Sequence, residues 1–214
     1  MALDDMATLV APQRMVLCEG RPLGTKGSPS RQEYDARCLM RIFAAECPDT
    51  EFISGGSSDE VGRDSIRLVA ALERVASGVK CIRVIDRDGR TQEEVDEIEK
   101  RGMRIFRRRH LECYLLDDEV LETLCSQQGN PEKVSEVKKA RDDAVAQAQA
   151  RGKPADGAKS AAGVFFNLAK ALVEIPDPGS NWEAFCATHM SKACQKGLSV
   201  YEELKEDIFG ATAP

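Results

Sequence analysis

The 214-residue sequence lacks any run of about 18 apolar residues, so we predict no segment that spans a membrane. Residues 1–5 (MALDD) also lack the basic and then apolar layout of a signal peptide. Basic side chains are in the minority, with 30 Lys and Arg against 36 Asp and Glu. The net charge of −6 argues against a generally basic nucleic-acid coat protein, which needs clustered Lys and Arg. A nucleic-acid enzyme with a local basic patch remains open.

The sequence also lacks a CxxC motif, although it contains eight cysteines. Several of them, such as Cys18 and Cys81, stand inside apolar runs, where a free cysteine behaves as a small buried hydrophobic residue. We therefore predict a reduced, cytoplasmic protein. The nearest approach to a zinc pattern is Cys186-x2-His189-x4-Cys194, but it has no convincing fourth ligand and its spacing fits an amphipathic helix.

Apolar runs and helical patterns alternate along the first half of the chain, and this predicts an α/β fold with a parallel sheet flanked by helices. The expected strands cover residues 14–18, 51–53, 80–85 and 103–106. The expected helices cover residues 31–46, 59–77 and 91–101. Right-handed crossovers would bring the carboxyl end of every strand to the same edge of the sheet.

From about residue 117 onward the sequence predicts helices only. Residues 131–151 are rich in Ala, Lys, Glu, Asp and Gln and have few large apolar side chains, which we interpret as a solvated helix or an arm. Residues 159–175 predict a helix with a well-buried face, and a last helix is expected over 199–209. Ser180 or Asn181 is a candidate cap for the helix that carries Trp182.

Carboxylates follow several of the predicted strands. Glu19 comes after the first strand, Asp86 and Asp88 come after the third, and Glu112 follows the fourth. Each of them alone is more often part of a turn, and Asp-Arg-Asp-Gly is a favourable turn sequence. Together, at one edge of a parallel sheet, they would repel one another unless a cation neutralised them. Mg²⁺ is the expected cation, because it takes carboxylates, water and substrate phosphate as ligands.

These residues carry a resemblance to a known family. Residues 16–20 (VLCEG) together with 84–88 (VIDRD) resemble a Toprim domain, and in more detail the nuclease branch of the OLD (overcoming lysogenization defect) and DUF4435 proteins. Residues 110–116 (HLECYLL) are similar to a Glu-x-Tyr-Leu-Leu-type segment of that branch. The resemblance covers about residues 14–125 and predicts a Toprim-like (Rossmann-like) catalytic domain there. The residues themselves predict a leader over 1–13 and an all-helical extension over 126–214.

The resemblance implies a metal-dependent endonuclease that hydrolyses phosphodiester bonds with one or two Mg²⁺ or Mn²⁺ ions. Its catalytic residues would be Glu19, Asp86 and Asp88, and its metal ligands would be these three and Glu112. The family often has an Asp about three residues after the Glu-Gly, whereas this chain has residues 22–24 (PLG) there. Either Glu33 or Asp35 could take that place.

Candidate substrate contacts are basic. Residues 80–110 contain ten Lys and Arg and seven acids, and we expect Arg87, Arg107, Arg108, Arg109 and His110 to contact a phosphate backbone. The alternative is a solvated rim that balances acidic neighbours. Residues 24–28 (GTKGS) lack the spacing of a P-loop, although Lys26 is also expected to contact a substrate phosphate.

The expected partners are DNA or RNA and an ABC-type ATPase domain or subunit, because that branch works with such ATPases, often in anti-phage defence. The sequence itself has no Walker motif. A homo-oligomer is left open. The alternative function is a non-catalytic Toprim-fold module that binds nucleic acid or a protein. A primase-like polymerase is disfavoured, since no zinc module or second catalytic domain is visible.

Overall fold

The computed structural model describes residues 12–26, 28–63 and 78–211. The chain forms two compact units. The first extends to Asp86 and includes Arg90–Ile105, whereas the second comprises Arg87–Gly89 and the chain from Phe106 onward. Most of the predicted leader lies outside the described residues, and the predicted domain boundary at residue 125 stays a prediction.

The first unit is built on a four-stranded sheet in which all strands are parallel, with the order β2-β1-β3-β4. The predicted α/β class with a parallel sheet is therefore confirmed. The strands are β1 (Arg14–Cys18), β2 (Thr50–Ser54), β3 (Lys80–Ile85) and β4 (Arg104–Ile105). In the register of the sheet, Cys18 at the end of β1 lies opposite Ser54 of β2 and Val84 of β3.

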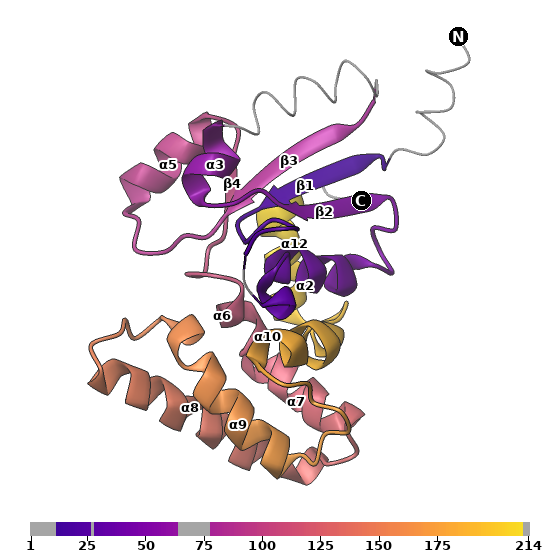
Figure 1. The fold of residues 1–214 in the computed structure, drawn as a ribbon, viewed down its shortest axis with the longest axis vertical. Helices are drawn as coiled ribbons and strands as arrows, with labels where there is room; N and C mark the ends of the chain where they lie inside the picture. Colours follow the sequence, from indigo (N-terminus) through magenta and orange to yellow (C-terminus); the bar gives the residue numbers. More distant parts are fainter. Residues whose placement is uncertain (1–11, 27, 64–77, 212–214) are drawn as a thin grey trace. The chain divides into compact units, whose positions relative to one another are not determined.

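Helices cover both faces of this sheet (Figure 1). Helix α2 (Tyr34–Phe43) lies on one face, and α3 (Ser58–Arg63) and α5 (Gln92–Lys100) lie on the other. On the α2 face, the ring of Phe43 stacks on Phe52 of β2 with 6.0 Å between the centroids. The structure describes only the first part of the helix predicted over 59–77, since residues 64–77 lie outside the described residues.

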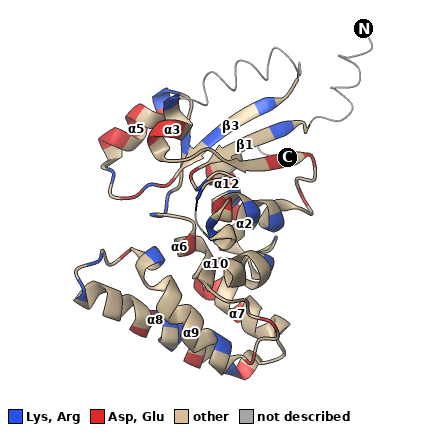
Figure 2. Ribbon diagram, viewed as in Figure 1, with Lys and Arg blue, Asp and Glu red and all other residues tan. Residues whose placement is uncertain are grey.

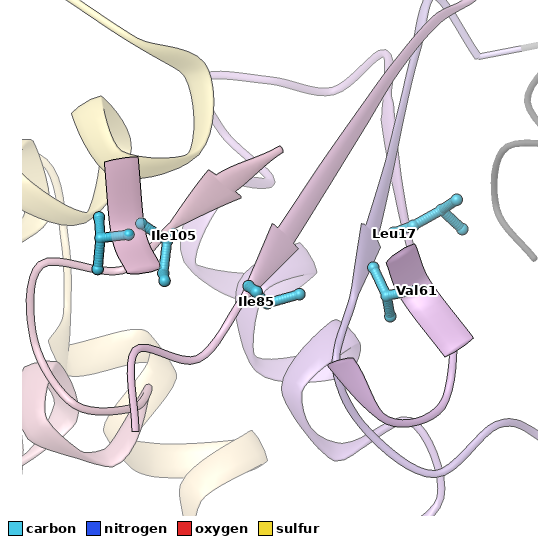
Figure 3. Packing of buried hydrophobic residues seen from close by; sticks show 5 residues of the cluster. Leu17, Val61, Ile85 and Ile105 are labelled. Carbon is cyan, nitrogen blue, oxygen red and sulfur yellow. The ribbon is translucent and has the colours of Figure 1, made fainter. Parts of the chain in front are cut away.

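The opposite face holds the apolar core that anchors α3 and α5 to the sheet (Figure 3). Leu17, Ile85 and Ile105 come from three neighbouring strands, and Val61 and Val95 come from α3 and α5. All five side chains are buried. The core follows from the alternation of side chains along each strand, because every second residue points to the same face.

Local signals define the ends of α5. The Thr91 hydroxyl accepts the Glu94 amide at 3.4 Å, and the Glu94 carboxylate accepts the Thr91 amide at 2.8 Å. This reciprocal capping box satisfies two amides that have no partner inside the helix. The helix ends before Gly102, whose φ of 75° favours glycine. The predicted helix over 91–101 is therefore confirmed.

The second unit is helical, as the sequence predicted. Its main helices are α6 (Glu112–Leu115), α7 (Asp118–Gln127), α8 (Val134–Ala150), α9 (Ala162–Leu172), α10 (Trp182–Phe185) and α12 (Ser199–Phe209). Asn181 caps α10, because its side-chain oxygen accepts the Ala184 amide at 2.9 Å. Phe185 contacts the rings of both Phe166 and Trp182 in the core of this unit.

The helix predicted over 131–151 is present as α8, but it is not an arm, because one of its faces is buried. Helix α8 packs against α9, and it does so through a stripe of buried small residues. Ala140, Ala144 and Ala148 recur every fourth position along this stripe. Small side chains bury little area each but allow two helices to approach closely, so an alanine-rich sequence can form a packed face without large apolar residues.

No helix in the described ranges has both the length and the apolar character needed to cross a membrane. Six of the eight cysteines are buried, which matches their expected behaviour as small hydrophobic residues.

The α8–α9 packing can be tested with one substitution made at two positions of α8. Ala144→Leu places a large side chain at a fully buried position and should lower the free energy of unfolding by about 1–3 kcal/mol. Ala146→Leu makes the same change at an exposed position and should have little effect. Urea denaturation of both variants measures the difference, and equal stabilities would contradict the packed face.

Candidate functional site

The candidate site lies at the carboxyl edge of the sheet, where the direction of the chain through the sheet reverses. From β1 the chain passes to β2 on one side, whereas β3 pairs with β1 on the other side and leads on to β4. Such a switch point is where open α/β sheets bind their ligands. Glu19 directly follows β1 and Asp86 directly follows β3, so these two predicted residues flank the switch point.

The loop after Glu19 returns to the same edge of the sheet. Gly20 pairs with Gly56 through two backbone hydrogen bonds of 2.9 and 3.0 Å, and Glu33 donates its amide to the carbonyl of Arg21 at 2.7 Å. Helix α2 therefore begins at this edge, and Asp35 in its first turn is buried there. An Asp35 carboxylate oxygen lies 3.7 Å from the position that a Cβ on Gly20 would occupy. Glu33 and Asp35 are the two candidates for the acidic position expected after Glu19-Gly20, and Asp35 is the buried one.

The pKa of the Cys18 thiol indicates which charges lie at this edge. Its side chain is 2% exposed, and its thiol contacts the carbonyl oxygen of Ile53 at 3.4 Å. Burial, followed by the negative charges of Asp35 and Asp86, raises the pKa of the Cys18 thiol well above its ordinary value. Two carboxylates from different elements therefore act on the same buried group, which makes this edge locally electronegative.

The carboxylates of Glu19, Asp35 and Asp86 are hard oxygen donors of the kind that Mg²⁺ prefers. No group of three or more His, Cys, Asp or Glu side chains within the described ranges is placed to hold a metal ion. Mg²⁺ is commonly bound through one or two carboxylates, with water and substrate phosphate completing its shell. Glu19 and Asp86 fit that mode of binding, which does not need a closed cage of protein ligands.

Lys26 is exposed in the loop between β1 and α2. The loop is held by Gln32, whose side-chain amide donates to the carbonyl of Thr25 at 2.7 Å and whose side-chain oxygen accepts the amide of Gly24 at 3.3 Å. The lysine therefore directly follows a part of the loop that Gln32 holds, and its side chain is exposed to an anion.

The remaining predicted residues belong to the second unit. Asp88 is exposed and has a φ of 49°, and its amide donates to the carbonyl of Arg109 at 2.9 Å. The guanidinium of Arg87 donates to the carbonyl oxygen of Arg107 at 3.3 Å. The segment Arg87–Gly89 is therefore a turn held by the backbone of residues 107–109, which accords with the turn character of its sequence.

The three consecutive arginines at 107–109 each form an ion pair inside the second unit. The pairs are Arg107 with Glu206 and Asp207, Arg108 with Glu203 and Asp117, and Arg109 with Asp156. Tyr114 adds a hydrogen bond from its hydroxyl to the buried Asp207 carboxylate. These ion pairs agree with the alternative interpretation of the sequence, in which the arginines balance acidic neighbours.

His110 and Glu112 form a buried pair in the same unit. The His110 Nδ1 and a Glu112 carboxylate oxygen are 3.3 Å apart, and both side chains are almost fully buried. Cys113 places its sulfur 3.4 Å from the same nitrogen. Burial lowers the pKa of His110, but the contacts with Cys113 and Glu112 outweigh it and raise the pKa to about 10. Burial likewise raises the pKa of Glu112, but His110 and Lys159 hold it below its ordinary value.

One feature of the first unit was missed in the sequence. A cavity of about 530 Å³ opens on the α3 and α5 face of the sheet, and Arg83 of β3 lines it. Arg83 alternates in phase with Ile85, so it occupies a position on the core side of the strand. An arginine at a core-facing position of the predicted strand is the feature of the sequence that could have indicated this cavity.

Comparison with protein-family models, with curated proteins and with solved structures gives no match to this chain.

The close approach at Gly20 predicts a specific loss of stability. Gly20 has a φ of 138°, and a Cβ there would lie 2.7 Å from the Ser54 hydroxyl. Gly20→Ala should therefore lower the free energy of unfolding by about 2–3 kcal/mol, since strain and steric overlap add. Gly24→Ala is the matched control, because Gly24 also has a positive φ but no atom within 4 Å of the added carbon. Urea denaturation should show the smaller loss for Gly24→Ala, and similar losses would contradict the close approach.

The buried pair also predicts a dependence of stability on pH. Because folding raises the pKa of His110 from 6.5 to about 10, its contribution is complete below pH 6.5 and is lost as the pH rises toward 10. The lowered pKa of Glu112 gives a contribution that is present above 4.5 and is lost as the pH falls. The midpoint of urea denaturation should therefore decline between pH 6.5 and 10, and Glu112→Gln should flatten that decline. An unchanged profile in the variant would show that the pair is not its source.

Proposed function

We propose that this protein is a divalent-metal-dependent nuclease that hydrolyses phosphodiester bonds in DNA or RNA in the cytoplasm. The observation that carries the proposal is the placement of Glu19 and Asp86 at the carboxyl ends of two adjacent parallel strands, on either side of the switch point. Carboxylates that lie close together repel each other unless a cation neutralises them, and phosphodiester hydrolysis is one of the reactions that a divalent cation at such an edge serves.

Glu19 and Asp86 are the residues that would hold the ion. When bound, a divalent cation supplies a positive charge that polarises the phosphoryl oxygen and favours attack by water. Asp35 contributes negative charge at the same edge, as its effect on the Cys18 thiol indicates. Lys26, exposed on the adjoining loop, is suited to hold a substrate phosphate by charge. Asp88 and Glu112 stay proposed ligands on the ground of the sequence resemblance alone.

The resemblance to the Toprim nucleases of the OLD and DUF4435 type extends this proposal. Its supports are the Glu-Gly after β1 and the Asp-x-Asp that begins directly after β3. On that basis we further propose an ABC-type ATPase as partner and a role in anti-phage defence.

A non-catalytic module with the same fold is the alternative function. The ion pairs of Arg107, Arg108 and Arg109 engage three of the proposed substrate contacts, and this keeps the alternative in view because it weakens the case for a substrate backbone at these residues. Such a module would bind nucleic acid or a protein without cutting.

The nuclease proposal is tested by incubating the protein with plasmid DNA and with tRNA, in Mg²⁺, in Mn²⁺ and in EDTA. Cleavage should require the metal and should fall at least about 100-fold in Glu19→Gln and in Asp86→Asn, because the loss of a supporting contact alone typically costs about 10–100-fold. Gel electrophoresis of the products over time gives the rates.

Matched controls are available in the same unit. Glu51→Gln and Asp49→Asn make the same chemical changes at exposed positions and should cleave at the wild-type rate. Metal-independent cleavage, or equal activity in the Glu19, Asp86 and control variants, would contradict the proposed site. Binding of either nucleic acid without cleavage under any metal would favour the non-catalytic module.

A further inference from the structure

The cavity on the α3 and α5 face has a composition unlike that of its surroundings. Helix α5 carries five acidic residues, and acidic residues are also visible on α3 (Figure 2). Yet none of the α5 acids lines the cavity, and Asp59 is the one acid among its lining residues. Four arginines line it instead. They are Arg63, Arg83, Arg90 and Arg101. The cavity therefore has a net charge of +3 at neutral pH, in a chain whose net charge is −6.

Arg83 is held in place before any ligand arrives. Its guanidinium donates to the carbonyl of Arg101 at 3.0 Å and to the carbonyl of Gly62 at 3.4 Å. These contacts fix the side chain between Arg101 at the end of α5 and Gly62 of α3, but leave its positive charge without a carboxylate among the described residues. A guanidinium that is oriented in advance loses little conformational entropy on binding, so it is well suited to recognise a phosphate.

Three of the residues that line the cavity are apolar, and we call them its apolar floor. Ile85, Ile98 and Met103 line it, and Ile85 belongs to the core that anchors the two helices. A flat aromatic ring would cover such a floor, while an attached phosphate would reach the arginines. The volume of about 530 Å³ lies within the range of about 300–1,000 Å³ that is usual for sites of small ligands.

We propose that this cavity binds a nucleotide, with the phosphate on Arg83 and Arg101 and the base on the apolar floor. The ligand is a nucleoside that carries a phosphate. Either a free nucleotide or the end of a nucleic-acid strand has this group. Arg90 connects the cavity to the carboxyl edge of the sheet, because it lines the cavity and donates to the carbonyl of Asp86 at 2.7 Å. A strand end bound here would therefore run toward Asp86. The binding itself depends neither on a metal nor on cleavage, so it goes beyond the proposed function.

The experiment measures binding in EDTA, where the proposed cleavage cannot take place. The probe is a fluorescent trinucleotide with a 5′-phosphate, followed by fluorescence polarisation, and the competitors are a nucleoside monophosphate and the same nucleoside without phosphate. The probe should bind, and the phosphate-free nucleoside should compete at least about tenfold more weakly than the monophosphate, because hydrogen bonds to charged groups are strong.

Three variants locate the site. Arg83→Gln and Arg101→Gln should each weaken binding by about tenfold or more. Arg101 is exposed at the end of α5 and none of its side-chain atoms is needed for the fold contacts above, so its variant tests the site even if Arg83→Gln is destabilised. Arg104→Gln is the control, because Arg104 is an exposed arginine of β4 that does not line the cavity.

The outcomes distinguish a free nucleotide from the end of a strand as the ligand. They also distinguish a failure of the cavity site from a failure of the nuclease proposal. Competition by the monophosphate identifies a free nucleotide as sufficient, whereas binding of the trinucleotide alone identifies a strand end. Absence of binding by both, equal competition by the phosphate-free nucleoside, or an equal loss in Arg104→Gln would overturn the proposed cavity site. Binding that survives in Glu19→Gln while cleavage is absent would leave this inference standing and would count against the nuclease alone.

Discussion

The parallel pairing of β1 with both of its neighbours is the constraint on which the first unit depends. Because β2, β1 and β3 run in one direction and in register, their carboxyl ends meet at one edge. The helices α2, α3 and α5 are then placed on the two faces, where they cover apolar side chains that alternate along each strand. The same pairing sets Glu19 beside the chain that leads to Asp86, so the acidic edge is a consequence of strand register rather than of any local motif.

Acidic and basic side chains gather at different places within this unit. The carboxyl edge gathers Asp35 and Asp86 around a buried thiol, whereas the α3 and α5 face gathers arginines around a cavity. A cation would complement the first and a phosphate would complement the second, as the proposed nuclease and the proposed nucleotide site require. Neither feature is visible in the net charge of the chain. In the second unit, by contrast, the arginines at 107–109 are each matched by a carboxylate.

The elements of the sheet were largely predictable because buried parallel strands are continuous apolar runs. The strands at 14–18 and 80–85 have the predicted bounds, and Gly102 ends α5 as expected. Helix α8 was misinterpreted, because alanines at 140, 144 and 148 contribute little to a hydrophobic pattern although they form a buried face. Arg83 was counted only as part of a basic segment, since its phase in β3 acquires meaning when α3 and α5 enclose a cavity over it.

The sequence by itself determined the class of fold, the direction of the strands and the residues that follow them, because these depend on the local periodicity of apolar side chains and on turn residues. Tertiary structure alone decided which charges meet. Asp35 reaches the edge through a loop that returns beside Gly20, and the arginines at 107–109 find their partners about 10 to 100 residues away in sequence. Contacts between distant segments depend on how helices and strands pack, and no local pattern of residues records that packing.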